Sequence, residues 1–279
     1  MDFSDFEHIV QRAASHTMSK KKLIYTGLTL FFCGLVMVFG LSASLVFGSW
    51  LALSLNFVPL FVSLALIMGL GVILVRSYHD EIKKKEVEFR DLAMRSWSTI
   101  LGTLSLFVPV VIAYLALWMA QGVFLVCTSI PFIGQFFAII FAFIPFVLHL
   151  ATLLLGVLSI YFLFCLTPTL SLGTSWQQGN FVQAFKESLK QGLTRLLLFV
   201  VAFFPLLVSF ILLMTSLKMT TVMFTEMSNP EEAVMQRFFL MLPFALLLAP
   251  SVIFFFNVAT ETNVFIHKSF IPKSGTEEI

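Results

Sequence analysis

A run of forty residues without Asp, Glu, Lys or Arg, residues 131–170, constrains the fold more than any other part of the sequence. At ~1.5 Å per residue, a continuous helix over this run is roughly 60 Å long, about twice the hydrocarbon thickness of a bilayer. Two interpretations follow. Either the run crosses a membrane twice, or residues 131–144 form a surface helix or a re-entrant segment before a single crossing from Pro145 to Pro168.

The composition is that of a membrane protein. Hydrophobic residues make up 59% of the 279 residues, Phe alone occurs 34 times, and charged residues make up only 11%. Soluble domains carry about 25% charged residues. The length gives room for about six crossings with short connections. We therefore expect no separate soluble domain.

Apolar runs recur along the whole chain and predict an all-α, polytopic integral membrane protein with about six transmembrane helices. We expect a leader at residues 1–22, a membrane domain at residues 23–267 and a tail at residues 268–279, with both termini cytoplasmic. Interfacial helices are expected around residues 134–142 and 181–193. The predicted spans are about residues 23–45, 51–75, 99–120, 145–168, 196–217 and 238–258.

The distribution of positive charge favours six spans and sets their orientation. With six spans, 15 of the 17 Lys and Arg residues fall on one side, and only Lys218 and Arg237 fall on the other. A double crossing of residues 131–170 lowers the majority to 12. Positive residues collect on the cytoplasmic side of membranes, so six spans are preferred. Trp97 and Trp176 then fall at cytoplasmic ends, and Trp50 and Trp118 fall at outer ends, as interfacial indole rings should.

The polar segments next to the spans each carry a local prediction. The start of the chain has capping-box spacing at Ser4 and Glu7, which predicts a short surface helix before the first span. Ser42-Ala43-Ser44 imitates a signal-peptide cleavage site, but the apolar run before it is longer than a signal core, which favours an uncleaved span. Residues 76–97 predict a solvated helix, because opposite charges such as Glu81 and Lys85 fall four residues apart. Its lysines, residues 83–85, serve as a positive-inside anchor or contact anionic lipid.

A second amphipathic segment follows the long apolar run. Asn180 and Gln183 have capping-box spacing, and apolar residues then recur at helical spacing up to Leu193. The helix either lies in the cytoplasmic interface, with Gly192 as its flexible end, or is an ordinary connector.

The letters of residues 184–192, AFKESLKQG, lead into Arg195 and the next apolar run. This string resembles the "aromatic, Ala-hydrophobic-basic-x-Ser, basic-x-Gly" segment of a six-helix bacterial membrane domain. That domain occurs fused to glycerophosphodiester phosphodiesterases and alone in uncharacterised membrane proteins. The likeness in sequence covers residues 131–217, and the rest of the chain is similar only in its number of helices. It implies a six-helix membrane domain and no catalytic residue, because the chemistry of the fused proteins belongs to their soluble domain.

The sequence argues against an enzyme and against a bound cofactor or metal. No Asp or Glu lies inside a predicted span, and Glu261, the nearest, is expected at the interface. HExxH and GxSxG motifs are absent, and His149 has no second intramembrane His beside it. The cysteines are odd in number and lack CxxC spacing, so they are interpreted as small buried hydrophobes: Cys33, Cys127 and Cys165.

Uncharged polar residues within the apolar runs are the candidate ligand-binding groups. Asn56, Gln121, Gln135 and His149 are predicted near the outer surface, whereas Asn257 is predicted on the cytoplasmic side. One interpretation is that they make interfacial or interhelical hydrogen bonds. The other is that the first four form a shallow polar vestibule open to the outside. Prolines within five of the predicted spans either kink helices for packing or free carbonyls that coordinate ions.

The sequence therefore predicts a non-enzymatic, multi-pass protein of the bacterial inner membrane that acts through lipid or protein contacts. Membrane lipid is the expected partner, together with a protein partner or a second copy of the chain, and no nucleic acid is expected. The alternative is a small transporter or permease subunit that uses the vestibule. A carrier usually places a polar or charged group at the membrane midplane, and the sequence lacks one.

Overall fold

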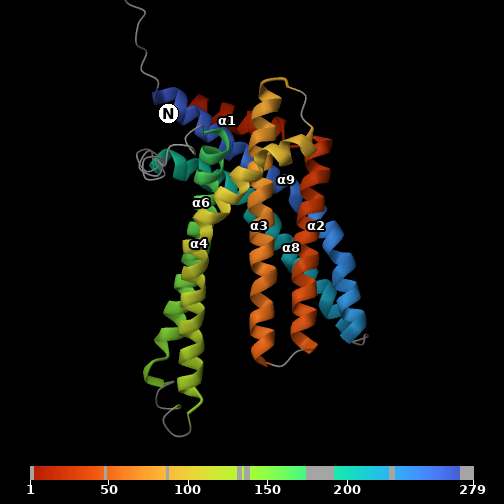
Figure 1. Cartoon of the computed structure of the whole chain (residues 1–279), viewed down its shortest axis with the longest axis vertical. Helices are drawn as coiled ribbons and strands as arrows, with labels where there is room; N and C mark the ends of the chain where they lie inside the picture. The colour runs from red at the N-terminus through yellow and green to blue at the C-terminus, as the bar shows by residue number, and fades with distance from the viewer. Residues whose placement is uncertain are drawn as a thin grey trace, which may run out of the picture. The chain divides into compact units, whose positions relative to one another are not determined.

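The computed structural model describes residues 3–46, 49–85, 88–130, 134, 139–173, 192–225 and 230–270, and the secondary-structure elements named in these ranges are α-helices. Within some helices the backbone alone is described. The chain divides into two compact units, residues 1–100 with 164–279, and residues 101–163. The helices are α1 (Phe3–Ser15), α2 (Lys20–Val46), α3 (Ser49–Ile82), α4 (Phe89–Thr128), α6 (Phe143–Leu172), α8 (Gly192–Thr225) and α9 (Pro230–Phe270), shown in Figure 1.

Six of these helices, all except α1, are long and apolar enough to cross a membrane. The chain is therefore an all-α, multi-pass membrane protein, as its apolar runs predict. Each predicted span lies within one of the six helices, and each helix extends beyond its span at both ends. The predicted interfacial helix at residues 181–193 lies outside the described residues except for its end. The same holds for most of residues 134–142.

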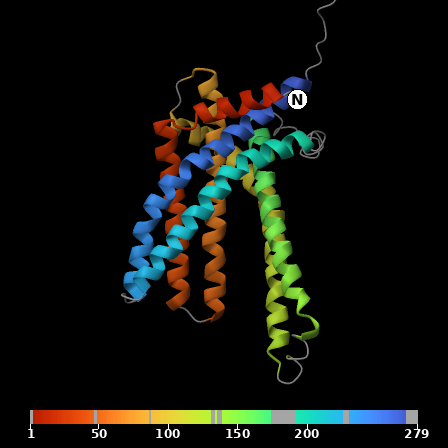
Figure 2. The ribbon, with the colours of Figure 1, turned by 180° about the vertical axis from the view of Figure 1, so that it is seen from behind.

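The first unit is built on α2, α3, α8 and α9. The hairpin partners α2 and α3 lie side by side, and α9 packs along both α2 and α8 (Figures 1 and 2). Two glycines on one face of α2 allow α9 to come close. A Cβ atom at Gly27 would lie 2.9 Å from Leu246 Cδ2, and one at Gly34 would lie 2.9 Å from Met241 Sδ. Small residues at such crossings let the helix backbones approach, as is common in membrane bundles.

The core of this unit lies where α3 meets the second half of α9. Val72, Leu74 and Val75 are buried here together with Phe255 and Phe256. Gly71 has no space for a side chain, because its Cβ atom would lie 2.5 Å from Phe256 Cε1. Phe164, from the end of α6, meets Phe255 edge to face with ring centroids 5.4 Å apart. The Phe256 ring therefore occupies the space that the absent side chain of Gly71 leaves open.

The amphipathic helix α1 runs across one end of the first unit, at a large angle to α2 (Figure 2). Its buried residues Ile9 and Ala13 lie four apart and so share one side of the helix. This agrees with the surface helix that the sequence predicts at the start of the chain. The second unit is the pair formed by α4 and α6, where the Cβ atom of Gly156 would lie 3.1 Å from the Tyr114 hydroxyl oxygen.

The charged segment at residues 76–97 is not one solvated helix, so that prediction is wrong. Helix α3 continues through Arg76 and ends at Ile82, and α4 begins at Phe89. Lys84 has a φ of 56°, in the left-handed region. The Lys84 N–H donates to Glu81 O at 2.9 Å, and the Lys85 N–H donates to Asp80 O at 3.0 Å. These two bonds form a Schellman cap, which ends α3 and turns the chain toward α4.

Candidate functional site: an apolar cavity and a buried polar cluster

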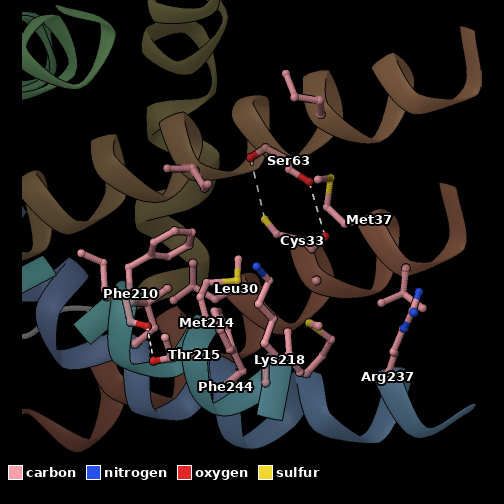
Figure 3. Close-up of a pocket in the computed structure, with 18 of the residues that line it drawn as sticks. Leu30, Cys33, Met37, Ser63, Phe210, Met214, Thr215, Lys218, Arg237 and Phe244 are labelled. Carbon is pink, nitrogen blue, oxygen red and sulfur yellow. Dashed lines mark hydrogen bonds between the residues drawn. The ribbon is translucent and has the colours of Figure 1, made fainter. Parts of the chain in front are cut away.

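A cavity of about 860 Å³ lies within the first unit, between α2, α3, α8 and α9. Cys33 and Met37 of α2 and Ser63 of α3 line one side of it (Figure 3). The opposite side comes from α8 and α9. Its lining residues are Leu30, Cys33, Gly34, Met37, Val38, Leu60, Ser63, Leu64, Ile67, Phe210, Ile211, Met214, Thr215, Leu217, Lys218, Arg237, Met241, Phe244 and Leu248.

The neutral polar groups of the lining are occupied by backbone partners. The Ser63 hydroxyl donates to Cys33 O at 3.4 Å, and the Cys33 thiol reaches Ser63 O at 3.8 Å, so α2 and α3 exchange two contacts. Thr215 Oγ1 donates to Ile211 O within its own helix at 2.7 Å. Because these groups already have partners, the walls offer a ligand mainly hydrocarbon and sulfur surface. An apolar ligand suits such a surface better than water does.

Among the described lining residues of the cavity, Lys218 and Arg237 are the charged ones. Lys218 lies seven residues before the end of α8 at Thr225, and Arg237 lies seven residues after the start of α9 at Pro230. At ~1.5 Å per residue, both lie about 10 Å from the ends of their helices and hence at a similar depth. The ends of both side chains reach from α8 and α9 toward the α2–α3 hairpin (Figure 3).

The cavity is partly open and not enclosed, and several of its lining side chains are exposed. The exposed fractions of Met37, Leu60 and Ile211 are 39%, 49% and 51%. In a membrane-spanning helix such side chains face lipid and not water. The cavity is therefore open along part of its wall to the surrounding bilayer.

A buried polar cluster occupies the other end of the first unit, where α1, α2, α3 and α9 meet. Lys22 is fully buried, and its ammonium nitrogen lies 2.5 Å from Glu81 Oε2. The same nitrogen lies 5.1 Å from the centre of the Tyr78 ring, in cation–π geometry. His16 completes this side of the cluster, with its Nδ1 atom 3.6 Å from Glu81 Oε2.

Glu261 of α9 forms the second half of the buried polar cluster. The Tyr78 hydroxyl donates to Glu261 Oε1 at 2.7 Å, and Arg12 Nε lies 3.6 Å from the same oxygen. The sequence predicts Glu261 at the interface, and the structure buries it at one end of the bundle. The reason is that α1 covers this end and supplies the compensating charge. Asn257, one turn earlier, donates from Nδ2 to Ala13 O at 3.1 Å and so fastens α1 to α9.

Arg76 of α3 connects two further segments to this end of the first unit. Its Nη1 donates to Ser96 Oγ at 2.9 Å, and its Nη2 donates to Thr99 Oγ1 at 2.7 Å. Its Nε donates to Ser171 O at 3.1 Å, at the end of α6. The start of α4 and the end of α6 therefore join the end of α3 at the same level of the bundle.

The structure describes the side chains of only two of the four predicted vestibule residues. Gln121 is half-exposed, and His149 is exposed, with its Nδ1–H donating to Pro145 O at 2.6 Å within α6. The side chains of Asn56 and Gln135 lie outside what the structure describes. The convergence of the four groups therefore stays a prediction. Cys33 and Cys165 are buried free cysteines, as their apolar surroundings predict, and Cys127 is half-exposed.

Sequence reasoning missed both the cavity and the buried polar cluster. The cavity draws its walls from four helices, and no local pattern indicates which faces of those helices meet. One signal was present, because Lys218 and Arg237 are the two Lys or Arg residues on the predicted outer side, and both line the cavity. The buried polar cluster gave a weaker signal through Glu261, the carboxylate nearest to a predicted span.

No known protein-family model, curated protein or solved structure matches the chain. The resemblance to the six-helix membrane domain therefore stays a prediction based on residues 184–192.

Proposed function

We propose that this chain is a non-enzymatic integral membrane protein that binds a lipid inside its helix bundle. The observation that carries the proposal is the apolar cavity between α2, α3, α8 and α9. Its volume of about 860 Å³ lies in the range of roughly 300–1,000 Å³ that is typical of ligand sites. A molecule of the bilayer reaches it through the exposed lining side chains without crossing water.

The chemistry of the lining supports binding and not catalysis. The described hydroxyl and thiol groups of the lining, those of Cys33, Ser63 and Thr215, each contact a backbone carbonyl oxygen. The described lining residues include no His, Asp or Glu that would act as a general base for them. A ligand held against such walls is bound and released unchanged.

We further propose the bacterial inner membrane as the location, with both termini in the cytoplasm. The support comes from the end of the bundle at which α1 lies. Lys22, the end of α3 with its three following lysines, and the start of α4 are collected there. The last turns of α9 lie at the same end through Glu261. This grouping fits an even number of crossings and a single positively charged side.

Blocking the cavity tests the proposed function. Met214 lines the cavity, whereas Met219, on the same helix, is 73% exposed and is not among its described lining residues. Met214→Trp should fill the space and lower the amount of lipid that stays bound through purification in mild detergent, as counted by native mass spectrometry. Met219→Trp, the same change outside the cavity, should retain as much lipid as the parent protein. Equal retention by the two variants would overturn the proposal.

A further inference from the structure

We propose that the cavity selects a phospholipid with a net negative headgroup, which Lys218 and Arg237 hold at one end of the apolar walls. This inference rests on the proposed function and names its ligand class. The described lining residues place two cations at one level and mainly apolar side chains at the other levels. An anionic phospholipid is divided in the same way, into a charged headgroup and apolar chains. The occupant we propose is a lipid of the leaflet at the α8–α9 connection, which the sequence places on the outer side.

The length of the cavity matches one leaflet. Along α9 the lining residues extend from Arg237 to Leu248, eleven residues apart. At ~1.5 Å per residue this is about 16 Å, and half of a ~30 Å hydrocarbon core is about 15 Å. Along α8 the lining extends from Lys218 back to Phe210, again away from the helix end. A headgroup at the two cations therefore leaves its acyl chains beside the apolar lining.

The two cations differ in how they bind a phosphate. The planar guanidinium of Arg237 can donate two parallel hydrogen bonds to phosphate oxygens, and the ammonium of Lys218 acts as a point charge. A bound phosphodiester accepts such hydrogen bonds through its oxygens. Its negative charge is not cancelled when the rest of the headgroup is neutral and carries no amine.

The headgroup preference distinguishes this lipid from others that fit the walls. A zwitterionic lipid carries the same phosphate but also a cation, which the positive charges of Lys218 and Arg237 repel. A free phosphate has no acyl chain and gains nothing from the apolar walls. We therefore expect binding in the order phosphatidylglycerol, then phosphatidylethanolamine, with inorganic phosphate not retained.

The test measures this preference on the full-length protein. Delipidated protein is titrated with phosphatidylglycerol or phosphatidylethanolamine, and bound lipid is counted by native mass spectrometry. Lys218→Ala and Arg237→Ala should each lower phosphatidylglycerol affinity by roughly tenfold, about the effect of one charge-assisted hydrogen bond. Lys21→Ala, which removes an exposed charge outside the cavity lining, is the matched control and should leave the affinity unchanged.

The outcomes separate this inference from the proposed function. If Met214→Trp loses both lipids while Lys218→Ala and Arg237→Ala keep the parent preference, the cavity binds lipid but the headgroup inference is wrong. Equal lipid binding by Met214→Trp and the parent protein would contradict both the proposed function and the headgroup inference. If the two alanine variants lose thermal stability to the same extent in either lipid and keep the preference, the cations serve the protein's own packing and the inference fails.

Discussion

At the scale of single residues, the buried polar cluster shows what a sequence pattern leaves open. Lys20, Lys21 and Lys22 are equivalent in the sequence, where they mark the polar border of the first span. A helix turns by about 100° per residue, so the three side chains point in different directions. Lys22 shares its side of α2 with Thr26 and Cys33, which are also buried. The inward direction follows from that shared side, but the partner Glu81 follows only from the packing of α3.

Removing the Lys22 charge should destabilise the protein. Lys22→Met leaves the Glu81 carboxylate without its nearest cation inside the bundle end, where the Glu81 side chain is only 27% exposed. Buried pairs that lose one partner cost several kcal/mol, and partial exposure of Glu81 lowers our expectation to about 1–3 kcal/mol. The measurement is the midpoint of thermal unfolding in detergent. Lys21→Met, at an exposed position, is the control and should leave the midpoint unchanged.

At the scale of secondary-structure elements, the six long helices follow from the sequence because membrane spans need only length and an apolar composition. The positions at which these helices end do not follow from the sequence. Residues 76–97 contain opposite charges four apart, and each such pair contributes only a few tenths of a kcal/mol to a helix. In the structure Glu81 contacts Lys22 and His16 instead, and the chain turns at Lys84. Contacts between helices outweigh the local charge pattern here.

The turn at Lys84 gives the prediction at this scale. A non-glycine residue in the left-handed region costs roughly 1–2 kcal/mol, and glycine adopts it without that cost. Lys84→Gly should therefore stabilise the protein by about 1 kcal/mol, measured as a higher midpoint of thermal unfolding. Lys83→Gly removes the same charge from the neighbouring residue, whose φ is not positive, and should lower the midpoint. A lower midpoint for Lys84→Gly would mean that the Schellman cap does not form.

At the scale of the whole molecule, the sequence predicts how often the chain crosses the membrane better than it predicts what the crossings enclose. The predicted number of spans rests on Lys and Arg counts over the whole chain, so a misplaced boundary in one helix changes it little. The cavity depends instead on which faces of α2, α3, α8 and α9 meet. Gly34 illustrates this, because it permits the close approach of Met241 beside the cavity, and nothing in the residues around it distinguishes it from Gly40.

The topology supplies the last prediction, because the headgroup-binding end and the buried polar cluster must face opposite sides of the membrane. Six crossings place Glu88, between α3 and α4, on one side and Ser228, between α8 and α9, on the other. On a background without Cys33, Cys127 and Cys165, Glu88→Cys should react with a membrane-impermeant maleimide only after the cytoplasmic side is opened. Ser228→Cys should react in intact cells. Labelling of both positions from the same side would contradict an even number of crossings with cytoplasmic termini. Labelling of both positions from the cytoplasmic side would also move Lys218 and Arg237 to the leaflet opposite to the one proposed for the bound lipid.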